Sequence, residues 1–133
     1  MSIYMLDTNT VICAIKRQPQ VIQRLLAVPM HSMCISAITA GELAFGLAKR
    51  PQALALKVAV QAFLQNVEVL PWDHGVALSY GTLRAKLQNK GTPLSPLDTQ
   101  IAAHAMHVKA TLVSSDKAFS HVDALVIEDW GKA

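Results

Sequence analysis

The stretch PLSPLDTQIAAHAMHVKATLVSSDKAF, residues 93–119, shows how the chain is built. Ser95 and Pro96 predict the start of a helix, because serine caps helices and proline fits the first helical turn. An apolar strand over residues 110–113 follows this helix, and Asp116 lies in the turn after the strand. A helix that feeds a short strand is the unit from which parallel sheets are made, so the stretch predicts an α/β fold.

The same alternation of strands and helices continues along the rest of the chain. Apolar runs predict strands over residues 2–6, 32–35, 67–70, 110–113 and 125–127. Helices are expected over residues 11–15, 21–27, 37–49 and 52–65, between Asp73 and Gly91, and from Ser95 onward. We therefore predict one domain, residues 1–133, with a three-layer α/β fold. Its central sheet would have four to five mostly parallel strands, with helices on both faces.

The composition excludes several classes of protein. Hydrophobic residues make up 52% of the chain and charged residues 16%, which excludes a disordered tail. No apolar run reaches the roughly 18 residues that cross a membrane, and the N-terminus does not resemble a signal peptide. The two cysteines suit a reducing compartment, so we expect a cytoplasmic protein without membrane contact. The net charge of +3 is a mild preference for polyanions.

Four of the nine acidic residues fall where the predicted fold would bring them together. Asp7 follows the first strand, and Asp116 follows the fourth. Glu42 lies in the helix after the second strand, and Asp98 begins the helix before the fourth. Because the carboxyl ends of parallel strands share one edge of a sheet, we expect these side chains at one rim.

Such a cluster is unstable unless some of its acids are protonated or a cation neutralises them. Two carboxylates about 5 Å apart repel by roughly 3 kcal/mol at an effective dielectric constant near 20. A divalent ion removes this cost, and an all-oxygen set of ligands favours Mg²⁺ or Mn²⁺ over zinc. The bound ion could then activate a water for attack on a phosphodiester.

Each acid also has a simpler interpretation as a helix cap. Asp7 and Asp116 each precede a helix, and aspartate is a preferred capping residue. Ser95-x-x-Asp98 and Thr39-x-x-Glu42 have the spacing of capping boxes. The spacing of the acids alone leaves both interpretations open.

Two other functions are compatible with the same residues. An aspartyl-phosphate phosphohydrolase would use Asp7, which follows a strand and precedes Thr-Asn-Thr. Such enzymes want a second acid two residues later, and this chain has Asn9 there. The other alternative is a non-catalytic module that binds RNA or a protein, with the acids serving only as caps.

Several motifs resemble those of a known family. MLDTN at 5–9, TAGEL at 39–43, GTPLSPLDTQIAAHA at 91–105, LVSSDKAF at 112–119 and IEDW at 127–130 resemble the PIN-domain ribonucleases. More narrowly, the chain is similar to the VapC toxins of bacterial toxin–antitoxin pairs. The resemblance implies a PIN-like fold and a Mg²⁺- or Mn²⁺-dependent endoribonuclease. Its catalytic residues would be Asp7, Glu42, Asp98 and Asp116, with the ion held by Asp7, Asp98 and Asp116.

The resemblance also implies supporting residues and partners. Thr8 and Asn9 would orient Asp7, and Ser114 or Ser115 would support Asp116. A cognate VapB-type antitoxin would insert its tail into the active-site groove, and the chain would reach operator DNA only through that antitoxin. The toxin would form a homodimer and cleave structured RNA, such as a tRNA anticodon loop.

The remaining motifs have ordinary interpretations. His104 and His107 form H-x-x-H on a helix, but we expect one buried histidine and one surface histidine rather than a metal pair. Basic residues that could contact RNA phosphates are Lys16, Arg17, Arg84, Lys86 and Lys90. The apolar stretches 21–28 and 47–63 could belong to the core, or could bind an antitoxin helix or a second copy.

Overall fold

A computed structural model describes residues 2–132, and within them five short strands form one parallel sheet. The sheet order is β3-β2-β1-β4-β5. The strands are β1 (Tyr4–Leu6), β2 (Met33–Ser36), β3 (Glu68–Leu70), β4 (Thr111–Val113) and β5 (Ile127–Glu128). This confirms the predicted sheet, with shorter first and last strands. Ile3 lies outside β1, yet its carbonyl still accepts a hydrogen bond from the Thr111 N–H at 2.8 Å.

Of the six helices within residues 2–132, four begin at a residue whose side chain caps them. Their bounds are α1 (Thr8–Ile15), α2 (Pro19–Ala27), α3 (Ala37–Ala48), α4 (Leu54–Gln65), α5 (His74–Lys90) and α6 (Pro96–His107). Two short 3₁₀ segments are η1 (Met30–Ser32) and η2 (Lys117–His121). The caps of α1, α3, α5 and α6 are the side chains of Asp7, Ser36, Asp73 and Ser95. Gly91 ends α5 at φ 79°, a left-handed conformation that glycine adopts without a steric penalty.

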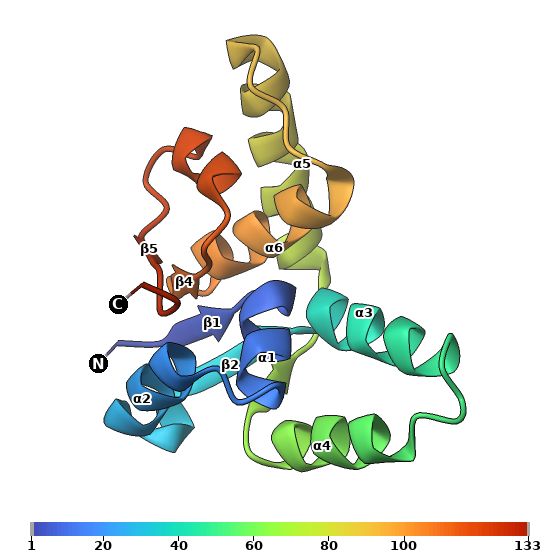
Figure 1. Ribbon diagram of the computed structural model, residues 1–133. Helices are drawn as coiled ribbons and strands as arrows, with labels where there is room; N and C mark the ends of the chain where they lie inside the picture. Colours follow the sequence, from blue (N-terminus) through green and yellow to red (C-terminus); the bar gives the residue numbers. More distant parts are fainter. Residues whose placement is uncertain (1, 133) are drawn as a thin grey trace.

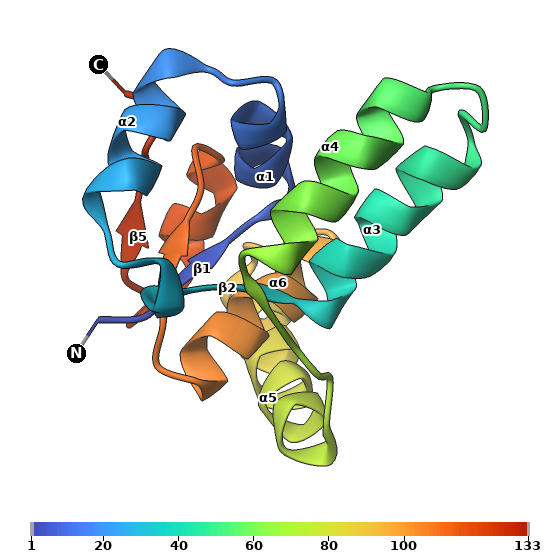
Figure 2. The same cartoon turned by 90° about the horizontal axis from the view of Figure 1, so that it is seen from below.

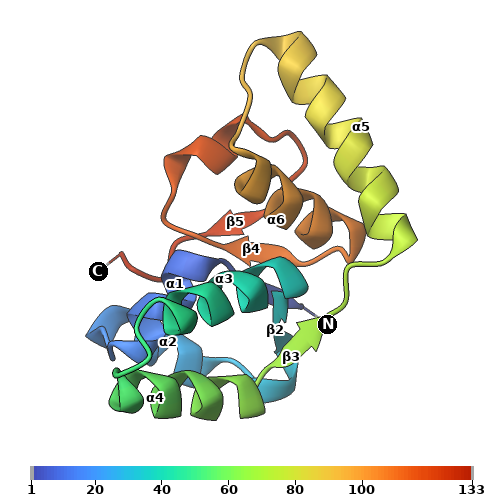
Figure 3. The ribbon, with the colours of Figure 1, turned by 90° about the vertical axis from the view of Figure 1, so that its right-hand side faces the viewer.

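The sheet has a hydrophobic core on each face, because successive residues of a strand point to opposite sides. Met5 of β1 and Leu112 of β4 pack with the residues of α5 and α6. Their neighbours Leu6 and Val113 pack with residues from α1, α3 and α4. Figure 3 shows α5 and α6 on one face and α1 to α4 on the other, which confirms the predicted three layers.

Two features of the helical layers bear on function. The first is that α3 and α4 lie side by side and extend away from the sheet (Figure 2). The second is that β1 and β4 are adjacent, although the chain leaves β1 towards β2 on the other side (Figure 1). The order of the strands therefore reverses between β1 and β4, where α/β sheets bind ligands at their carboxyl ends. No helix within residues 2–132 has the length and apolar character to span a membrane.

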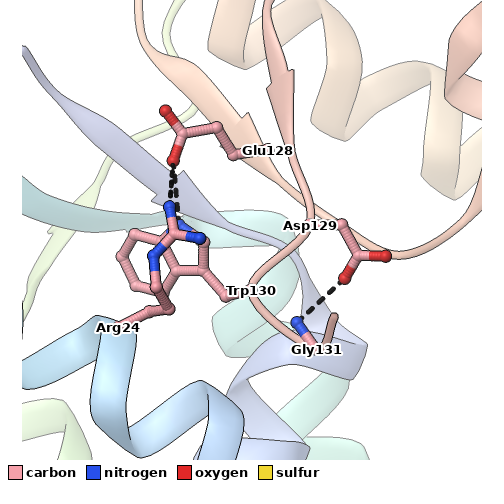
Figure 4. A network of polar contacts seen from close by, with 5 residues as sticks. All are labelled: Arg24, Glu128, Asp129, Trp130 and Gly131. Atoms are coloured by element: carbon pink, nitrogen blue, oxygen red, sulfur yellow. Dashed lines mark hydrogen bonds and ion pairs between the residues drawn. The ribbon is translucent and has the colours of Figure 1, made fainter. Parts of the chain in front are cut away.

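The C-terminal segment is attached to α2 by one buried tryptophan (Figure 4). Trp130 is 1% exposed, and its ring centroid lies 5.5 Å from that of Tyr4. Its Nε1–H donates to Glu128 Oε1 at 3.0 Å, and Arg24 donates to the same oxygen at 3.0 Å. The Arg24 guanidinium lies 5.9 Å from the Trp130 ring centroid. Asp129 points the other way and accepts the Gly131 N–H at 2.9 Å.

Replacing Trp130 by alanine should lower the free energy of unfolding by about 3–5 kcal/mol, because it leaves a large cavity beneath α2. Arg24→Ala is the matched control, since it removes only the half-exposed partner and should cost no more than about 1 kcal/mol. Urea unfolding, monitored by circular dichroism, measures the free energy of unfolding of both variants. Equal losses for the two variants would show that the ion pair, and not the buried ring, holds the segment.

Candidate active site

Asp7 stands directly after β1 at the strand reversal. The residue is 4% exposed, and its Oδ1 accepts the Thr10 N–H at 2.8 Å, which caps α1. Its backbone N–H donates to the Val113 carbonyl at 3.1 Å, so the carboxyl ends of β1 and β4 are joined at this residue. The cap uses one carboxylate oxygen and leaves Oδ2 for another partner.

Glu42 is brought to Asp7's end of the sheet by α3. Thr8, the residue after Asp7, donates from Oγ1 to Glu42 Oε1 at 2.6 Å, and its Oγ1 lies 3.3 Å from the buried Thr39 Oγ1. The capping-box interpretation of Thr39-x-x-Glu42 is wrong, because Ser36 caps α3 and accepts the Ile38 N–H at 3.1 Å. Glu42 therefore has no capping role, and its hydrogen bond ties it to the residue next to Asp7.

Asp98 and Asp116 are held by serine side chains. Asp98 lies in the first turn of α6, where its N–H donates to Ser95 Oγ at 3.2 Å. Asp116 caps η2 by accepting the Ala118 N–H at 2.9 Å, and its own N–H donates to Ser114 Oγ at 3.0 Å. Ser114 is buried and Asp116 is exposed. The capping roles considered for Asp7 and Asp116 are thus present.

The four acids form one electrostatic group. Partial burial raises the pKa of Asp98, and the negative charges of Asp116, Asp7 and Glu42 raise it further, while the Ser95 hydrogen bond acts in the opposite direction. Acids that are far from Asp98 in the chain therefore disfavour its ionisation, as expected for carboxylates that lie near one rim. Asp98 thus lies within electrostatic range of the other three acids that the sequence singled out.

The supporting residues separate into two groups. Thr8 contacts Glu42 and Ser114 contacts Asp116, as described above. Asn9 is exposed and Ser115 lines a separate small hollow with Thr10 and Asp129. Of the two serines proposed beside the last acid, Ser114 is therefore the one in contact with it.

The two histidines of α6 have different partners. His104 is buried, with Nδ1 2.7 Å from Ser36 Oγ, and its burial lowers its pKa. His107 is exposed, with Nδ1 3.0 Å from Ser79 Oγ. They do not form a metal pair, and the contact between His104 and Ser36 was not predicted from the sequence.

The chemistry of the rim suits a hard divalent cation. Its donor atoms are carboxylate and hydroxyl oxygens, which favours Mg²⁺ or Mn²⁺ over zinc. Within residues 2–132, no three acidic, histidine or cysteine side chains already lie close enough to enclose an ion. Mg²⁺ commonly takes only one or two carboxylates and completes its shell with water and phosphate oxygens, so an open acidic rim fits it.

A groove of about 300 Å³ begins at Thr8 and Glu42 and continues between α1, α3 and α4. Apolar residues line much of it, namely Ile12, Ile15, Leu43, Leu47, Leu56 and Val60. Three basic residues also line it, namely Lys16, Lys49 and Arg50. Lys16 and the doublet Lys49-Arg50, which are far apart in the sequence, therefore contribute to one basic wall beside Glu42.

This combination of sheet and acidic rim defines a class. The model of the PIN domain family matches residues 4–125, and the chain belongs to that family of nucleases. Over 128 residues the chain is 38% identical to the tRNA(fMet)-specific endonuclease VapC of Salmonella typhimurium, covering 96% of this chain and 97% of the relative. It is also 32% identical over 133 residues to ribonuclease VapC2 of Rickettsia felis, covering 98% and 99%.

Solved structures agree with the sequence relatives. The DNA-bound VapBC of Salmonella typhimurium matches with a TM-score of 0.91 and 36% identity, covering 98% of this chain and 99% of that one. The VapBC2 of Rickettsia felis, bound to a promoter DNA fragment, matches with a TM-score of 0.88 and 30% identity, covering 95% and 97%. Within the PIN domain family, this chain is thus a VapC-type ribonuclease.

The raised pKa of Asp98 makes a prediction about stability. An acid whose pKa is higher in the folded state destabilises the fold when ionised, so the penalty is absent at acidic pH and appears as the pH rises through the folded-state pKa. Without divalent ions, Asp98→Asn should therefore raise the urea midpoint at neutral pH and change it less at acidic pH. Because solvent screens the charge of this partly exposed residue, the free energy of unfolding should rise by less than about 1 kcal/mol.

Asp123→Asn is the control for this measurement, because Asp123 is largely exposed and pairs with Lys90 outside the rim. It should give no stabilisation at either pH. An Asp98→Asn protein that is less stable than wild type at neutral pH would contradict the proposed repulsion among the four acids.

Proposed function

We propose that the chain is the toxin of a type II toxin–antitoxin pair and acts as a Mg²⁺-dependent endoribonuclease, for which Mn²⁺ can substitute. Its substrate would be a structured RNA, namely the anticodon loop of a tRNA, and cleavage would inhibit translation. The observation that carries the proposal is the group of four acids at the strand reversal. The similarity to a tRNA(fMet)-specific endonuclease supports the choice of RNA. We also propose that residues 1–133 act as one domain.

In this proposal Asp7, Asp98 and Asp116 hold the ion. When bound, the ion would polarise the scissile phosphate and lower the pKa of a water. Burial raises the pKa of Asp98, the neighbouring acids raise it further, and the charge of the ion would offset the effect of those acids. Helix capping and metal binding are compatible, because a cap through Oδ1 fixes the Asp7 carboxylate and leaves Oδ2 available.

Glu42 would act beside this set, either as a further ligand or as the base that takes the proton of the attacking water. The Thr8 hydroxyl holds Oε1 of Glu42 at 2.6 Å, so Oε2 is the oxygen left for that role. Ser114 fixes the backbone of Asp116. Hydrolysis at this site would leave 5′-phosphate and 3′-hydroxyl ends.

The groove beside Glu42 offers a path for the RNA backbone. Lys16, Lys49 and Arg50 line it, and none of the three has a carboxylate partner among the ion pairs of residues 2–132. Unpaired cations next to a metal site suit a polyanion whose scissile phosphate lies on the ion while its neighbours lie on the basic wall. RNA recognition would then depend on loop shape and phosphate contacts.

A VapB-type antitoxin is the proposed protein partner, since the solved relatives named above are VapBC complexes, and in both the complex is bound to DNA. The apolar part of the groove would take apolar side chains of the antitoxin, which would then cover the path of the RNA. Operator DNA would be reached only through the antitoxin. Leu54 and Val58 of α4 are 68% and 65% exposed and offer a surface to the antitoxin or to a second copy in a homodimer.

Asp7→Asn should lower the rate of RNA cleavage with Mg²⁺ at least about 10³-fold, while the fold is retained. This factor corresponds to roughly 4 kcal/mol in the activation free energy. Asparagine keeps an oxygen for the cap but loses the charge that the ion needs. Asp73→Asn is the matched control, because Asp73 caps α5 through the same type of contact, to the Val76 N–H at 2.9 Å, outside the rim. Expression in cells followed by mapping of new RNA 5′ ends measures cleavage.

The outcomes separate the alternative functions. An Asp7→Asn protein that cleaves as well as wild type would falsify the metal mechanism. A phosphorylated Asp7 trapped with a phosphate ester would point to an aspartyl-phosphate phosphohydrolase. A wild-type protein that binds RNA or an antitoxin but neither binds Mn²⁺ nor cleaves would be a non-catalytic binding module.

Replacing Lys49 and Arg50 together by glutamine should raise KM for RNA and make binding less dependent on salt, because two phosphate contacts are lost. The value of kcat should change little, since neither residue belongs to the acidic rim. Lys57→Gln is the control, as Lys57 is exposed on α4 and lies outside the groove lining. Salt dependence of RNA affinity, measured with the inactive Asp7→Asn protein, tests the contact, and an unchanged slope would exclude it.

A further inference from the structure

The proposed mechanism leaves one buried polar contact unused, between His104 of α6 and Ser36 at the end of β2. His104 is 1% exposed, and its Nδ1 lies 2.7 Å from Ser36 Oγ. Its ring packs edge-on against Trp72, with centroids 5.6 Å apart. An apolar side chain would fill this place without the cost of burying an imidazole, so the hydrogen bond itself calls for an explanation.

Ser36 connects this contact to the acidic rim. Its side chain is fully buried and caps α3 by accepting the Ile38 N–H at 3.1 Å. The helix that it caps carries Glu42, and the helix that holds His104 carries Asp98 in its first turn. The bond between Ser36 and His104 therefore joins the two helices that bring Glu42 and Asp98 to the rim.

These two helices also carry charges that repel each other. Glu42 of α3 and Asp98 of α6 are both carboxylates, and repulsion between like charges favours a wider separation of the two helices. Packing between apolar surfaces resists sliding only weakly, whereas a buried hydrogen bond is directional and fixes one register. A neutral imidazole is enough for this bond, and the burial of His104 favours the neutral form.

We propose that His104 is a positioning residue: through Ser36 it fixes α3 against α6 and so sets where Asp98, a proposed ligand of the divalent ion, lies relative to Glu42. This inference rests on the proposed function for the metal, but it concerns residues outside the metal site. Residues that orient metal ligands without touching the metal affect its binding, and replacing such a residue commonly weakens metal affinity by about 10–100-fold.

The test compares His104→Leu with His104→Asn in the full-length chain. Leucine keeps an apolar volume without a hydrogen bond, whereas the asparagine amide can place a polar atom near the position of Nδ1. Mn²⁺ affinity by calorimetry should fall about tenfold or more for leucine and recover for asparagine. The amide of Ile38 should exchange its hydrogen faster in the leucine variant only. In RNA cleavage, kcat should fall while KM stays unchanged.

His107→Leu is the matched control on the same helix, because His107 is exposed and contacts Ser79 instead. It should leave Mn²⁺ affinity unchanged. A His104→Leu protein with wild-type Mn²⁺ affinity and wild-type Ile38 exchange would overturn the proposal. If leucine prevents folding, asparagine is compared with glutamine, whose amide lies near the position of Nε2; equal Mn²⁺ affinity for these two would also overturn it.

These readouts separate the positioning role from the proposed function. A wild-type chain that binds Mn²⁺ but cleaves no RNA would refute the function, and the affinity of the His104 variants would still decide the positioning role. A wild-type chain that binds no Mn²⁺ would refute both.

Discussion

Repulsion among negative charges is the constraint on which the arrangement of this molecule depends. Burial raises the pKa of Asp98, and the charges of Asp116, Asp7 and Glu42, which come from three other places in the chain, raise it further. A protein gains no stability from such a group, since ionised carboxylates at close range oppose folding. Hydrogen bonds nevertheless fix each of these residues in place. The Thr10 N–H binds the Asp7 carboxylate, the Thr8 hydroxyl binds Glu42, and serine side chains bind the backbone N–H groups of Asp98 and Asp116.

The two interpretations of the acids turn out to be compatible. Asp7 and Asp116 do cap helices, and each uses a single oxygen, Oδ1, to do so. A carboxylate whose rotamer is fixed by a backbone N–H loses little freedom when it takes up an ion with its second oxygen. On the proposed function, capping at the ends of parallel strands would therefore pre-orient the ligands at the edge where α/β sheets bind their substrates.

Much of this could be predicted from the sequence, because it depends on short-range patterns. The strands, the caps Asp73 and Ser95 and the glycine after α5 follow from local propensities, and parallel pairing then places the acids at one edge. What could not be predicted depends on contacts across the fold. The hydrogen bond from Thr8 to Glu42 needs the packing of α1 against α3, and the contact of His104 with Ser36 needs the packing of α6 against β2. The basic wall of the groove requires knowing how α1 and α3 pack.

The central place of β1 has a consequence for the synthesis of the protein. This strand is made first, yet it pairs with β4, whose residues 111–113 are made near the end of the chain, and Asp116 comes later still. A nascent or truncated chain that stops before β4 has neither the second neighbour of β1 nor the complete acidic rim. On the proposed function, a ribosome making this nuclease finishes most of the polypeptide before the product can harm translation.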